Sequence, residues 1–413
     1  MSELKVEVDP AEVGLAEDRL RRLDGHFKRY VDDNLLTGWL LTVSRHGKMA
    51  HVSRYGQRDR EAGLDVEPDT LWRIYSMTKP VTSVAAMMLY EEGAFELTDP
   101  VSRFIPSFTN VRVFTGGNDQ RPVTVPVSEP VRIWHLLTHT SGLTYGFHRN
   151  HPVDAMYRAA GFDLGLRPGT LEEACDIWAS LPLLFQPGAE WNYSVSTDVL
   201  GRVVEVASGQ SLDEFFAQRI LGPLGMTDTG FYAKPEDLDR LAALYARGLN
   251  GKAARFNTLA EEARKPQTML SGGGGLVSTA ADYHRFLQML LPRPDSPAGE
   301  LDDVRLLSPR TVAYMGRNHL PGNQDLEHFG RPLNAESPQR GVGFGLGFAV
   351  VIDPVPGKVV CSSGEMSWGG AASTAFWIDP AEELTASFFT QLIPSTSHPI
   401  RSQLRQLVYQ ALL

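Results

Sequence analysis

The sequence predicts an α+β fold: an antiparallel sheet flanked by helices, with a helical region inserted between its strands. Three observations support this. A β-hairpin pattern occurs near the start of the chain, several strand patterns occur near its end, and helical patterns fill the middle. We therefore expect a discontinuous sheet domain over residues 1–95 and 270–413, and a mainly helical domain over 96–269. A ligand site is expected in the cleft between them.

The first hundred residues supply the first part of the sheet. A charged amphipathic pattern over 11–33 predicts a helix. Apolar runs at 38–44 and 49–55 flank Arg45-His46-Gly47-Lys48, which is typical of a hairpin turn. Residues 76–92 then read as a helix with an apolar face, and this helix ends near Gly93.

The remaining elements follow from the same periodicities. Further helices are predicted at 129–138, 170–180, 196–207, 211–220, 280–291 and 400–412, and strands at 341–350, 358–363, 371–378 and 384–391. Long connections lie at 106–127 and 142–169. Such connections are uncommon unless they shape a site. Together with 320–340, they are expected to set the size of the substrate that fits.

Composition and charge exclude several classes of protein. The chain has 413 residues, 42% hydrophobic and 21% charged, as expected of a globular protein with a sizeable core. The net charge of −10 argues against nucleic acid or an anionic membrane as a partner. Cys175 and Cys361 are far apart and predict two buried thiols. Neither a signal-peptide core nor a membrane-length apolar run occurs, so we expect a cytoplasmic protein.

Several catalytic motifs are missing. There is no G-x-S-x-G elbow of an α/β-hydrolase, no P-loop, and no H-E-x-x-H metal motif. His135 and His139 have the spacing of metal ligands, but no acid or third ligand accompanies them. We therefore predict no metal and no cofactor, and interpret these histidines as a structural cap at a helix end near Gly142.

The segment Ser76-Met77-Thr78-Lys79 is the main candidate for chemistry. On a helix, residues i and i+3 share one face, so the lysine amine can take the proton of the serine hydroxyl when that amine is neutral. The helix N-terminus also favours negative charge developing at the serine. Taken alone, Ser76 is explained equally well as a plain helix N-cap.

Two further segments favour catalysis. Tyr193 follows a Pro-Gly turn and precedes a helix, where its phenol could share proton transfer with Lys79. Trp368-Gly369-Gly370-Ala371 enters a late strand, and its glycines let the backbone approach another group closely. The N–H groups of Ala371 and Ser76 could then form an oxyanion hole. Core packing and a tight turn are the alternative explanations of these segments.

The order of these segments resembles the class C β-lactamase and family VIII carboxylesterase group of the serine β-lactamase/penicillin-binding superfamily. The segments His135–Leu143, Pro223–Thr229 and Gly273–Thr279 also look like recurrent segments of that group, so the resemblance covers about residues 35–400. It implies that Ser76 is the acylated nucleophile and that Lys79 and Tyr193 are the acid and base. It also implies that the N–H groups of Ser76 and Ala371 bind the oxyanion.

Two departures from the β-lactamase pattern concern substrate choice. Val195 stands where that pattern has asparagine, and Trp368-Gly369-Gly370 stands where it has Lys-Thr-Gly. The asparagine and the Lys-Thr pair bind the amide and carboxylate of a β-lactam, for which valine and tryptophan offer no partner. The Trp-Gly-Gly segment resembles the esterase branch. We therefore expect a small-molecule ester of a small acyl group as the substrate.

Three alternatives remain open at the level of sequence. The same residues could serve a β-lactamase or D-amino-acid peptidase, or an acyltransferase in which an alcohol replaces water. A non-catalytic binding protein on the same fold is disfavoured, because it would not need Ser76, Lys79 and Tyr193 together. The natural substrate, the stereoselectivity and the oligomeric state are left undetermined.

Overall fold

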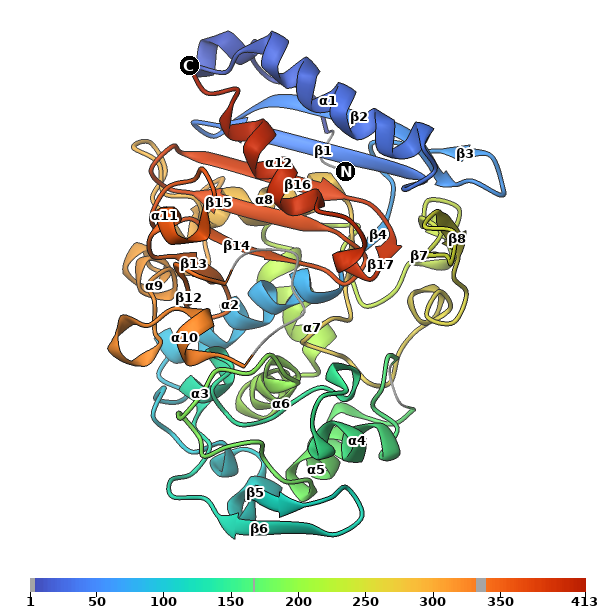
Figure 1. Ribbon diagram of the computed structural model, residues 1–413. Helices are drawn as coiled ribbons and strands as arrows, with labels where there is room; N and C mark the ends of the chain where they lie inside the picture. Colours follow the sequence, from blue (N-terminus) through green and yellow to red (C-terminus); the bar gives the residue numbers. More distant parts are fainter. Residues whose placement is uncertain (1–3, 166–167, 332–338) are drawn as a thin grey trace.

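The fold is built on one antiparallel sheet to which both ends of the chain contribute (Figure 1). The computed structural model describes residues 4–165, 168–331 and 339–413. The strand order is β12-β13-β14-β15-β16-β1-β2-β3. Their bounds are β1 Gly38–Arg45, β2 Lys48–Asp59, β3 Leu64–Asp65, β12 Val342–Phe344, β13 Ala349–Val351, β14 Met366–Gly369, β15 Ala375–Asp379 and β16 Leu384–Phe389.

The helices cover both faces of this sheet. The N-terminal helix α1 and the C-terminal helix α12 lie side by side on one face, and α2 and α8 lie on the other (Figure 1). Helices α3 to α6 form a separate layer beyond α2. The helical bounds are α1 Glu17–Asp32, α2 Thr78–Glu91, α3 Ile133–Leu137, α4 Pro152–Ala159, α5 Leu171–Ser180, α6 Ser196–Ser208, α7 Leu212–Phe216, α8 Ala280–Leu290, α9 Pro309–Met315, α10 Leu326–Phe329, α11 Pro354–Gly357 and α12 Ile400–Tyr409.

Two hydrophobic cores hold these layers together. The larger core lies between the sheet, α2, α8 and the inserted helices. The smaller core joins the sheet to α1 and α12, with Phe27, Trp39 and Phe388 in mutual ring contact. Burial of such large apolar side chains is the main stabilising contribution to a fold of this kind. The predicted α+β architecture is therefore confirmed.

Short strand pairs complete the structure. They are β4 Trp72–Arg73 with β9 Val277–Ser278, β5 Arg112–Gly117 with β6 Pro122–Pro126, β10 Glu300–Leu301 with β11 Val304–Arg305, and the sheet β17 Leu392–Ile393, β7 Tyr245–Arg247, β8 Ala253–Arg255. The hairpin β5–β6 and helix α4 lie in the segments predicted to be long connections, 106–127 and 142–169. Of the segment 320–340, residues 332–338 lie outside the described residues.

The N-terminal predictions are accurate to a few residues. The β1–β2 hairpin turns at His46 and Gly47, both with positive φ, as a two-residue turn of matching twist requires. The helix predicted at 76–92 appears as a 3₁₀ turn over Tyr75–Met77 followed by α2. The helix predicted at 129–138 is shorter, because Pro130 precedes it and α3 begins only at Ile133.

The C-terminal strands differ from prediction. The pattern at 341–350 is a hairpin, since Gly347 has a φ of 96° and separates β12 from β13. Residues 358–363 are not a strand: Lys358 ends the turn α11 in the left-handed region, and Val360 is 70% exposed. The strand is β14, a few residues later. The next strand begins at Ala375 rather than at 371, because Ser373 in the preceding turn has a positive φ.

Other predictions concern thiols, surfaces and boundaries. Cys175 is buried as expected, whereas Cys361 is only half-buried. No helix within the described ranges is long and apolar enough to cross a membrane.

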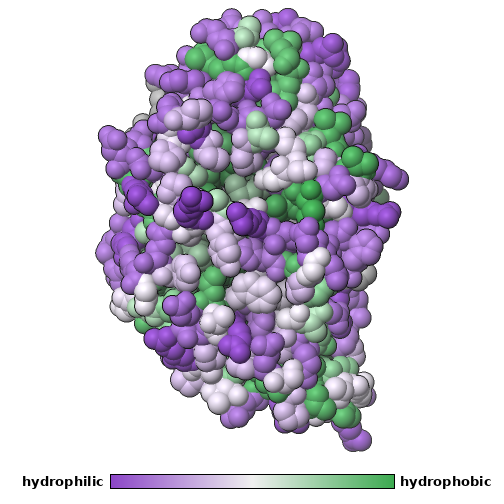
Figure 2. Space-filling view, turned by 90° about the vertical axis from the view of Figure 1, so that its left-hand side faces the viewer, coloured by the Kyte–Doolittle hydropathy of each residue, from purple (hydrophilic) through white to green (hydrophobic). Residues whose placement is uncertain are grey.

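On the face shown in Figure 2, hydrophobic residues lie in separate patches among hydrophilic ones. The domain boundaries after 95 and before 270 remain a prediction. Strand β17, beyond the second boundary, pairs with β7 before it.

Candidate active site

Ser76 lies where the chain enters helix α2. It belongs to the 3₁₀ turn Tyr75–Met77, which is separated from the short strand β4 by Ile74 alone. Tyr75 has a φ of 43°, a left-handed conformation that costs a bulky residue on the order of 1–3 kcal/mol. The buried helix that follows fixes this turn, since nearly all of α2 is inaccessible to solvent. The strained turn therefore presents Ser76 at the N-terminus of a rigid helix, where developing negative charge is favoured.

Lys79 and Tyr193 both converge on the serine hydroxyl, as the sequence predicts. Lys79 Nζ lies 3.1 Å from Ser76 Oγ, and Tyr193 OH lies 2.6 Å from the same atom. The Lys79 amine also lies 4.5 Å from the centre of the Tyr193 ring. Lys79 is only 2% exposed. A hydroxyl, an amine and a phenol in mutual reach have the geometry of an activated nucleophile with its acid and base.

The buried carboxylate of Asp198 supports the Lys79 amine indirectly, through the backbone of Gly273. Lys79 Nζ donates to the Gly273 carbonyl at 2.7 Å, and Asp198 on α6 accepts from the N–H of Gly273 at 3.0 Å and from Ser271 Oγ. Burial raises the pKa of the Asp198 carboxyl, while the nearby Lys79 charge opposes that shift. Sequence reasoning missed Asp198, Ser271 and Gly273 as members of the site. The run of four glycines at 272–275, directly after Ser271, was the available signal.

Tyr193 sits in an aromatic cluster. Its ring centre lies 5.3 Å from that of Tyr145, 5.2 Å from that of Trp368, and 5.1 Å from that of His139. Tyr145, also missed from the sequence, is 5.5 Å from the Lys79 amine. These rings hold the phenol in place, since buried aromatic side chains in contact have few accessible rotamers.

The two histidines serve the structure. His135 accepts a hydrogen bond from the Arg132 backbone, so it caps the start of α3 and not the expected helix end. His139 is fully buried and pairs with Ser194 Oγ at 3.2 Å. Burial lowers the pKa of His135 to about 4 and that of His139 well below its usual range, so both rings are neutral at pH 7. Among the described residues, no group of three potential ligands surrounds a metal position.

The Trp-Gly-Gly segment lies beside the serine turn, as expected. Trp368 and Gly369 end strand β14, which packs against the turn Tyr75–Met77. A Cβ on Gly370 would collide with the carbonyl of Ile74, so only glycine permits this approach. Ala371 belongs to the turn after β14, and not to a strand as predicted. It lines the same cavity as Ser76.

The cavity in front of Ser76 has a volume of about 660 Å³ and a mainly apolar wall. Val195 is buried and lines it. Trp368 is half-buried against Tyr193 and Phe344, and its indole N–H faces the Tyr193 oxygen at 3.4 Å. The apolar residues that line the cavity include Tyr145, Phe147, Leu164, Phe231, Leu259 and Met269. Concave, mostly apolar cavities of this size are typical of sites for small organic ligands.

Comparison with known proteins places the chain in a family. Its residues 23–410 match the Beta-lactamase family. The chain therefore belongs to that family, the serine β-lactamase/penicillin-binding superfamily, as the motifs indicate.

Individual relatives narrow the branch. Protein Rv1367c of Mycobacterium tuberculosis is 36% identical over 91% of both chains. Esterase EstB of Burkholderia gladioli is 33% identical over 97% of this chain and 98% of its own. Among solved structures, EstCE1, described as a hydrolase with promiscuous acyltransferase activity, has a TM-score of 0.80 and 28% identity. It covers 95% of this chain and 99% of its own.

Proposed function

We propose that this protein is a serine carboxylesterase that cleaves esters of small acyl groups through an acyl-enzyme on Ser76. The observation that carries the proposal is the contact of Ser76 Oγ with both Lys79 Nζ and Tyr193 OH inside an apolar cavity. The similarity to Esterase EstB and to EstCE1 supports an esterase. We assign the roles of nucleophile to Ser76 and of acid and base to Lys79 and Tyr193.

In the acylation step, Ser76 Oγ attacks the ester carbonyl carbon. Its proton passes to whichever of Lys79 and Tyr193 is deprotonated, because both lie within hydrogen-bond reach of Oγ. The Oγ–C bond forms and the carbonyl oxygen becomes an oxyanion. When the tetrahedral intermediate collapses, the C–O bond to the alcohol breaks. The leaving oxygen takes a proton from the same Lys79–Tyr193 pair, and the alcohol departs.

Deacylation repeats these proton transfers, with water in place of the serine hydroxyl and Ser76 Oγ as the leaving oxygen. A water molecule attacks the acyl carbon and loses a proton to the Lys79–Tyr193 pair. The bond between Ser76 Oγ and the acyl carbon breaks, Oγ recovers a proton, and the carboxylic acid is released. The backbone N–H groups of Ser76 and Ala371 are proposed to hold the oxyanion in both steps. Donors of this kind contribute about 2.7–4 kcal/mol each.

The walls of the cavity favour neutral substrates. Val195 is apolar, and the Trp368 indole presents its one polar atom to Tyr193 and not to a ligand carboxylate. A β-lactam carboxylate would therefore lose its hydration at these two positions without gaining a partner. This supports an ester over a β-lactam or a D-amino-acid peptide as the substrate.

The test is hydrolysis of p-nitrophenyl butyrate, with nitrocefin measured in parallel. We expect ester turnover in the wild type, loss of that turnover in Ser76→Ala, and little nitrocefin turnover. The matched control is Ser83→Ala, which removes a buried hydroxyl from the same helix α2 and should leave turnover unchanged. Turnover that survives in Ser76→Ala would refute the nucleophile. Fast nitrocefin turnover with slow ester turnover would favour the β-lactamase.

Acyl transfer to an alcohol is the second candidate. A cavity of about 660 Å³ has room for an organic acceptor beside a small acyl group. The activity named for EstCE1 points the same way. The ratio of butyl butyrate to butyric acid, measured with 1-butanol added, separates the two functions. A product that is mainly the acid supports the esterase, and one that is mainly the ester supports the transferase.

We also propose that the enzyme acts in the cytoplasm on a small-molecule ester, with neither nucleic acid nor a membrane as a partner. The net charge of −10 supports the absence of polyanionic partners. Cys175 and Cys361 are free thiols, as is usual in a reducing compartment.

A further inference from the structure

Arg401, on the C-terminal helix α12, reaches the backbone of the Trp-Gly-Gly segment. Its Nη2 donates to the carbonyl of Gly370 at 2.8 Å and to the carbonyl of Thr374 at 3.1 Å. These two carbonyls flank the turn that contains Ala371. The half-buried Arg401 guanidinium therefore hydrogen-bonds to the backbone on both sides of the turn that carries the Ala371 N–H, the proposed oxyanion donor.

The carbonyl of Gly370 and the N–H of Ala371 belong to the same peptide unit. That peptide is trans, since the one cis bond among the described residues is Ile393–Pro394. In a planar trans peptide the C=O and N–H bonds point in opposite directions. A donor that fixes the Gly370 oxygen therefore fixes the direction of the Ala371 N–H, which points away from Arg401.

The same contact strengthens the N–H as a donor. Hydrogen bonds from a charged group are about twice as strong as neutral ones, and a hydrogen bond at one end of an amide polarises the other end. The Arg401 charge on the Gly370 oxygen draws electron density from the Ala371 nitrogen. The N–H then binds a developing oxyanion more tightly than an unassisted amide would.

The two glycines of the segment fit this arrangement. A Cβ on Gly369 would lie 2.5 Å from Arg401 Nη2 and 2.6 Å from the Thr374 oxygen. A Cβ on Gly370 would strike Ile74, beside the serine turn. The absence of a side chain at Gly369 thus leaves space for the Arg401 guanidinium. At Gly370 it leaves space for the backbone next to the turn Tyr75–Met77, which carries Ser76.

A second arginine of helix α12 also binds near the Trp-Gly-Gly segment, at and just before strand β14. Arg405, one turn after Arg401, donates to Glu365 Oε1 and to Ser367 Oγ, each at 2.8 Å. Leu404 and Val408 bury the same helix against the smaller core. The Arg401 guanidinium is therefore carried by a rigid element and not by a mobile loop.

We propose that Arg401 is a positioning residue of the oxyanion hole, which acts through the Gly370–Ala371 peptide to orient and polarise the Ala371 N–H. This rests on the proposed function, since the oxyanion belongs to the Ser76 reaction. Arg401 stabilises the tetrahedral state and adds little to ground-state binding of the ester, so its effect should fall on kcat.

The test compares Arg401→Met and Arg401→Lys with the wild type on p-nitrophenyl butyrate. We expect kcat to fall about 10- to 100-fold in Arg401→Met with KM within twofold, less than the loss of a whole oxyanion donor. Arg401→Lys keeps the positive charge and the ability to donate a hydrogen bond, and should recover part of the rate. The rate at which a fluorophosphonate labels Ser76, followed by mass spectrometry, should fall in parallel, because its phosphoryl oxygen uses the same donors.

The matched control is Arg247→Met. Arg247 also donates to a backbone carbonyl of the C-terminal segment, that of Ser397 at 3.4 Å, but away from the Gly370 peptide. Its kcat and labelling rate should equal those of the wild type. A fall in Arg247→Met as large as that in Arg401→Met would overturn the proposal, since any lost arginine would then act alike.

Failure of this inference is distinguishable from failure of the esterase. Wild-type turnover that depends on Ser76, with kcat in Arg401→Met within twofold, overturns the role of Arg401 and leaves the esterase intact. If the wild type does not cleave the ester, fluorophosphonate labelling decides: equal rates in wild type and Arg401→Met overturn the role of Arg401. If Arg401→Met does not fold, Arg401→Lys decides by the same two measurements. A kcat and a labelling rate below those of the wild type support the role of Arg401, and wild-type values of both overturn it.

Discussion

The phenol oxygen of Tyr193 lies 2.6 Å from the hydroxyl oxygen of Ser76, although the two residues are 117 positions apart in the chain. The helices α2 and α6 pack against each other and bring them together. Tyr193 lies three residues before the start of α6, and Ser76 lies two residues before the start of α2. The site is therefore assembled where two buried helices begin, which makes its geometry depend on helix packing more than on loop conformation.

This relationship predicts the effect of Tyr193→Phe. The variant keeps the ring contacts with Tyr145 and Trp368 but loses the hydroxyl that reaches Ser76 Oγ. We expect kcat for p-nitrophenyl butyrate to fall about 10²- to 10⁴-fold, the usual contribution of an acid–base group, with an unchanged melting temperature. Tyr314→Phe, at an exposed ring on α9, is the control and should keep full activity. A rate within threefold of the wild type would exclude Tyr193 from proton transfer.

Gly370→Ala should damage the site through the backbone. The added Cβ would meet the Ile74 carbonyl and the Thr374 hydroxyl, neither of which is the far end of a flexible chain. We expect at least a tenfold loss of kcat, because a small misplacement of an oxyanion donor is costly. Gly25→Ala is the matched control, since a Cβ there meets nothing within 4 Å on helix α1. It should leave kcat unchanged and stabilise the protein by about 0.8–1 kcal/mol. Equal kcat in both variants would contradict the close approach.

Trp368→Phe separates the packing of the tryptophan from its polar contact. Phenylalanine keeps an aromatic ring between Tyr193 and Phe344 but removes the indole N–H, which lies 3.4 Å from the Tyr193 oxygen. A hydrogen bond contributes about 0.5–1.5 kcal/mol, so we expect a two- to tenfold lower kcat. Trp368→Ala should lower it further, because the ring packing is lost as well. Full activity in Trp368→Phe would show that only the packing matters.

Local patterns predicted the parts of the site that are local in the chain. The i, i+3 spacing of Ser76 and Lys79 gives their contact directly, because a helix start places both on one face. The β1–β2 hairpin is likewise encoded in a short turn sequence. Tyr193 was found through the order of its motif and not through periodicity.

Contacts between distant segments left no comparable signal. Gly273 accepts from Lys79 across 194 residues, and Asp198 holds that glycine from a third segment. The support of Gly370 by Arg401 is also a tertiary contact. Each of these residues, seen in the sequence, is an ordinary loop glycine or helix charge, so only the packed fold assigns its role.

The misplaced strand at 358–363 has a simple physical cause. Its apolar residues satisfy the composition of a strand, but Lys358 leaves the preceding turn with a φ of 54°, which directs the chain away from β13. The strand pairing with β13 begins only at β14, after Gly364 with a φ of 90°. Composition predicted the presence of a strand there, while backbone direction decided its position.

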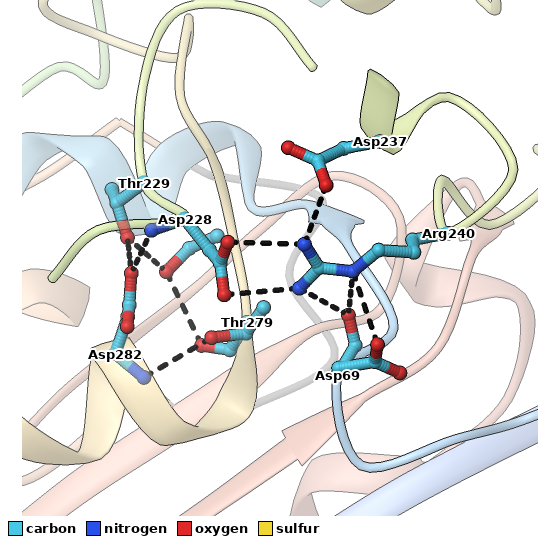
Figure 3. A network of polar contacts seen from close by, with 8 residues as sticks. Asp69, Asp228, Thr229, Asp237, Arg240, Thr279 and Asp282 are labelled. Carbon is cyan, nitrogen blue, oxygen red and sulfur yellow. Dashed lines mark hydrogen bonds and ion pairs between the residues drawn. The ribbon is translucent and has the colours of Figure 1, made fainter. Parts of the chain in front are cut away.

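A polar network between the short strands and α8 gives a prediction for pH (Figure 3). Asp282 Oδ2 accepts from the N–H of Asp228 and from Thr229 Oγ1, each at 2.8 Å. Arg240 then pairs with the other side of Asp228 at 2.9 Å. Burial raises the pKa of Asp282 to about 6, against the lowering effect of those hydrogen bonds. The carboxyl therefore holds its proton at a pH where the unfolded chain has released it.

The sign of the effect on stability follows. Between the ordinary pKa of 3.8 and about 6, the folded protein binds more protons than the unfolded chain, so the free energy of unfolding falls as pH rises through this window. The shift corresponds to about 3 kcal/mol at most. Asp282→Asn cannot ionise. We therefore expect the difference in unfolding free energy, wild type minus Asp282→Asn, to decrease by up to that amount between pH 4 and pH 7.

Urea unfolding of both proteins at four pH values measures this difference. Asp295→Asn, at an 81% exposed side chain, should follow the wild type throughout. A difference independent of pH would show that Asp282 has the same pKa in the folded protein as in the unfolded chain.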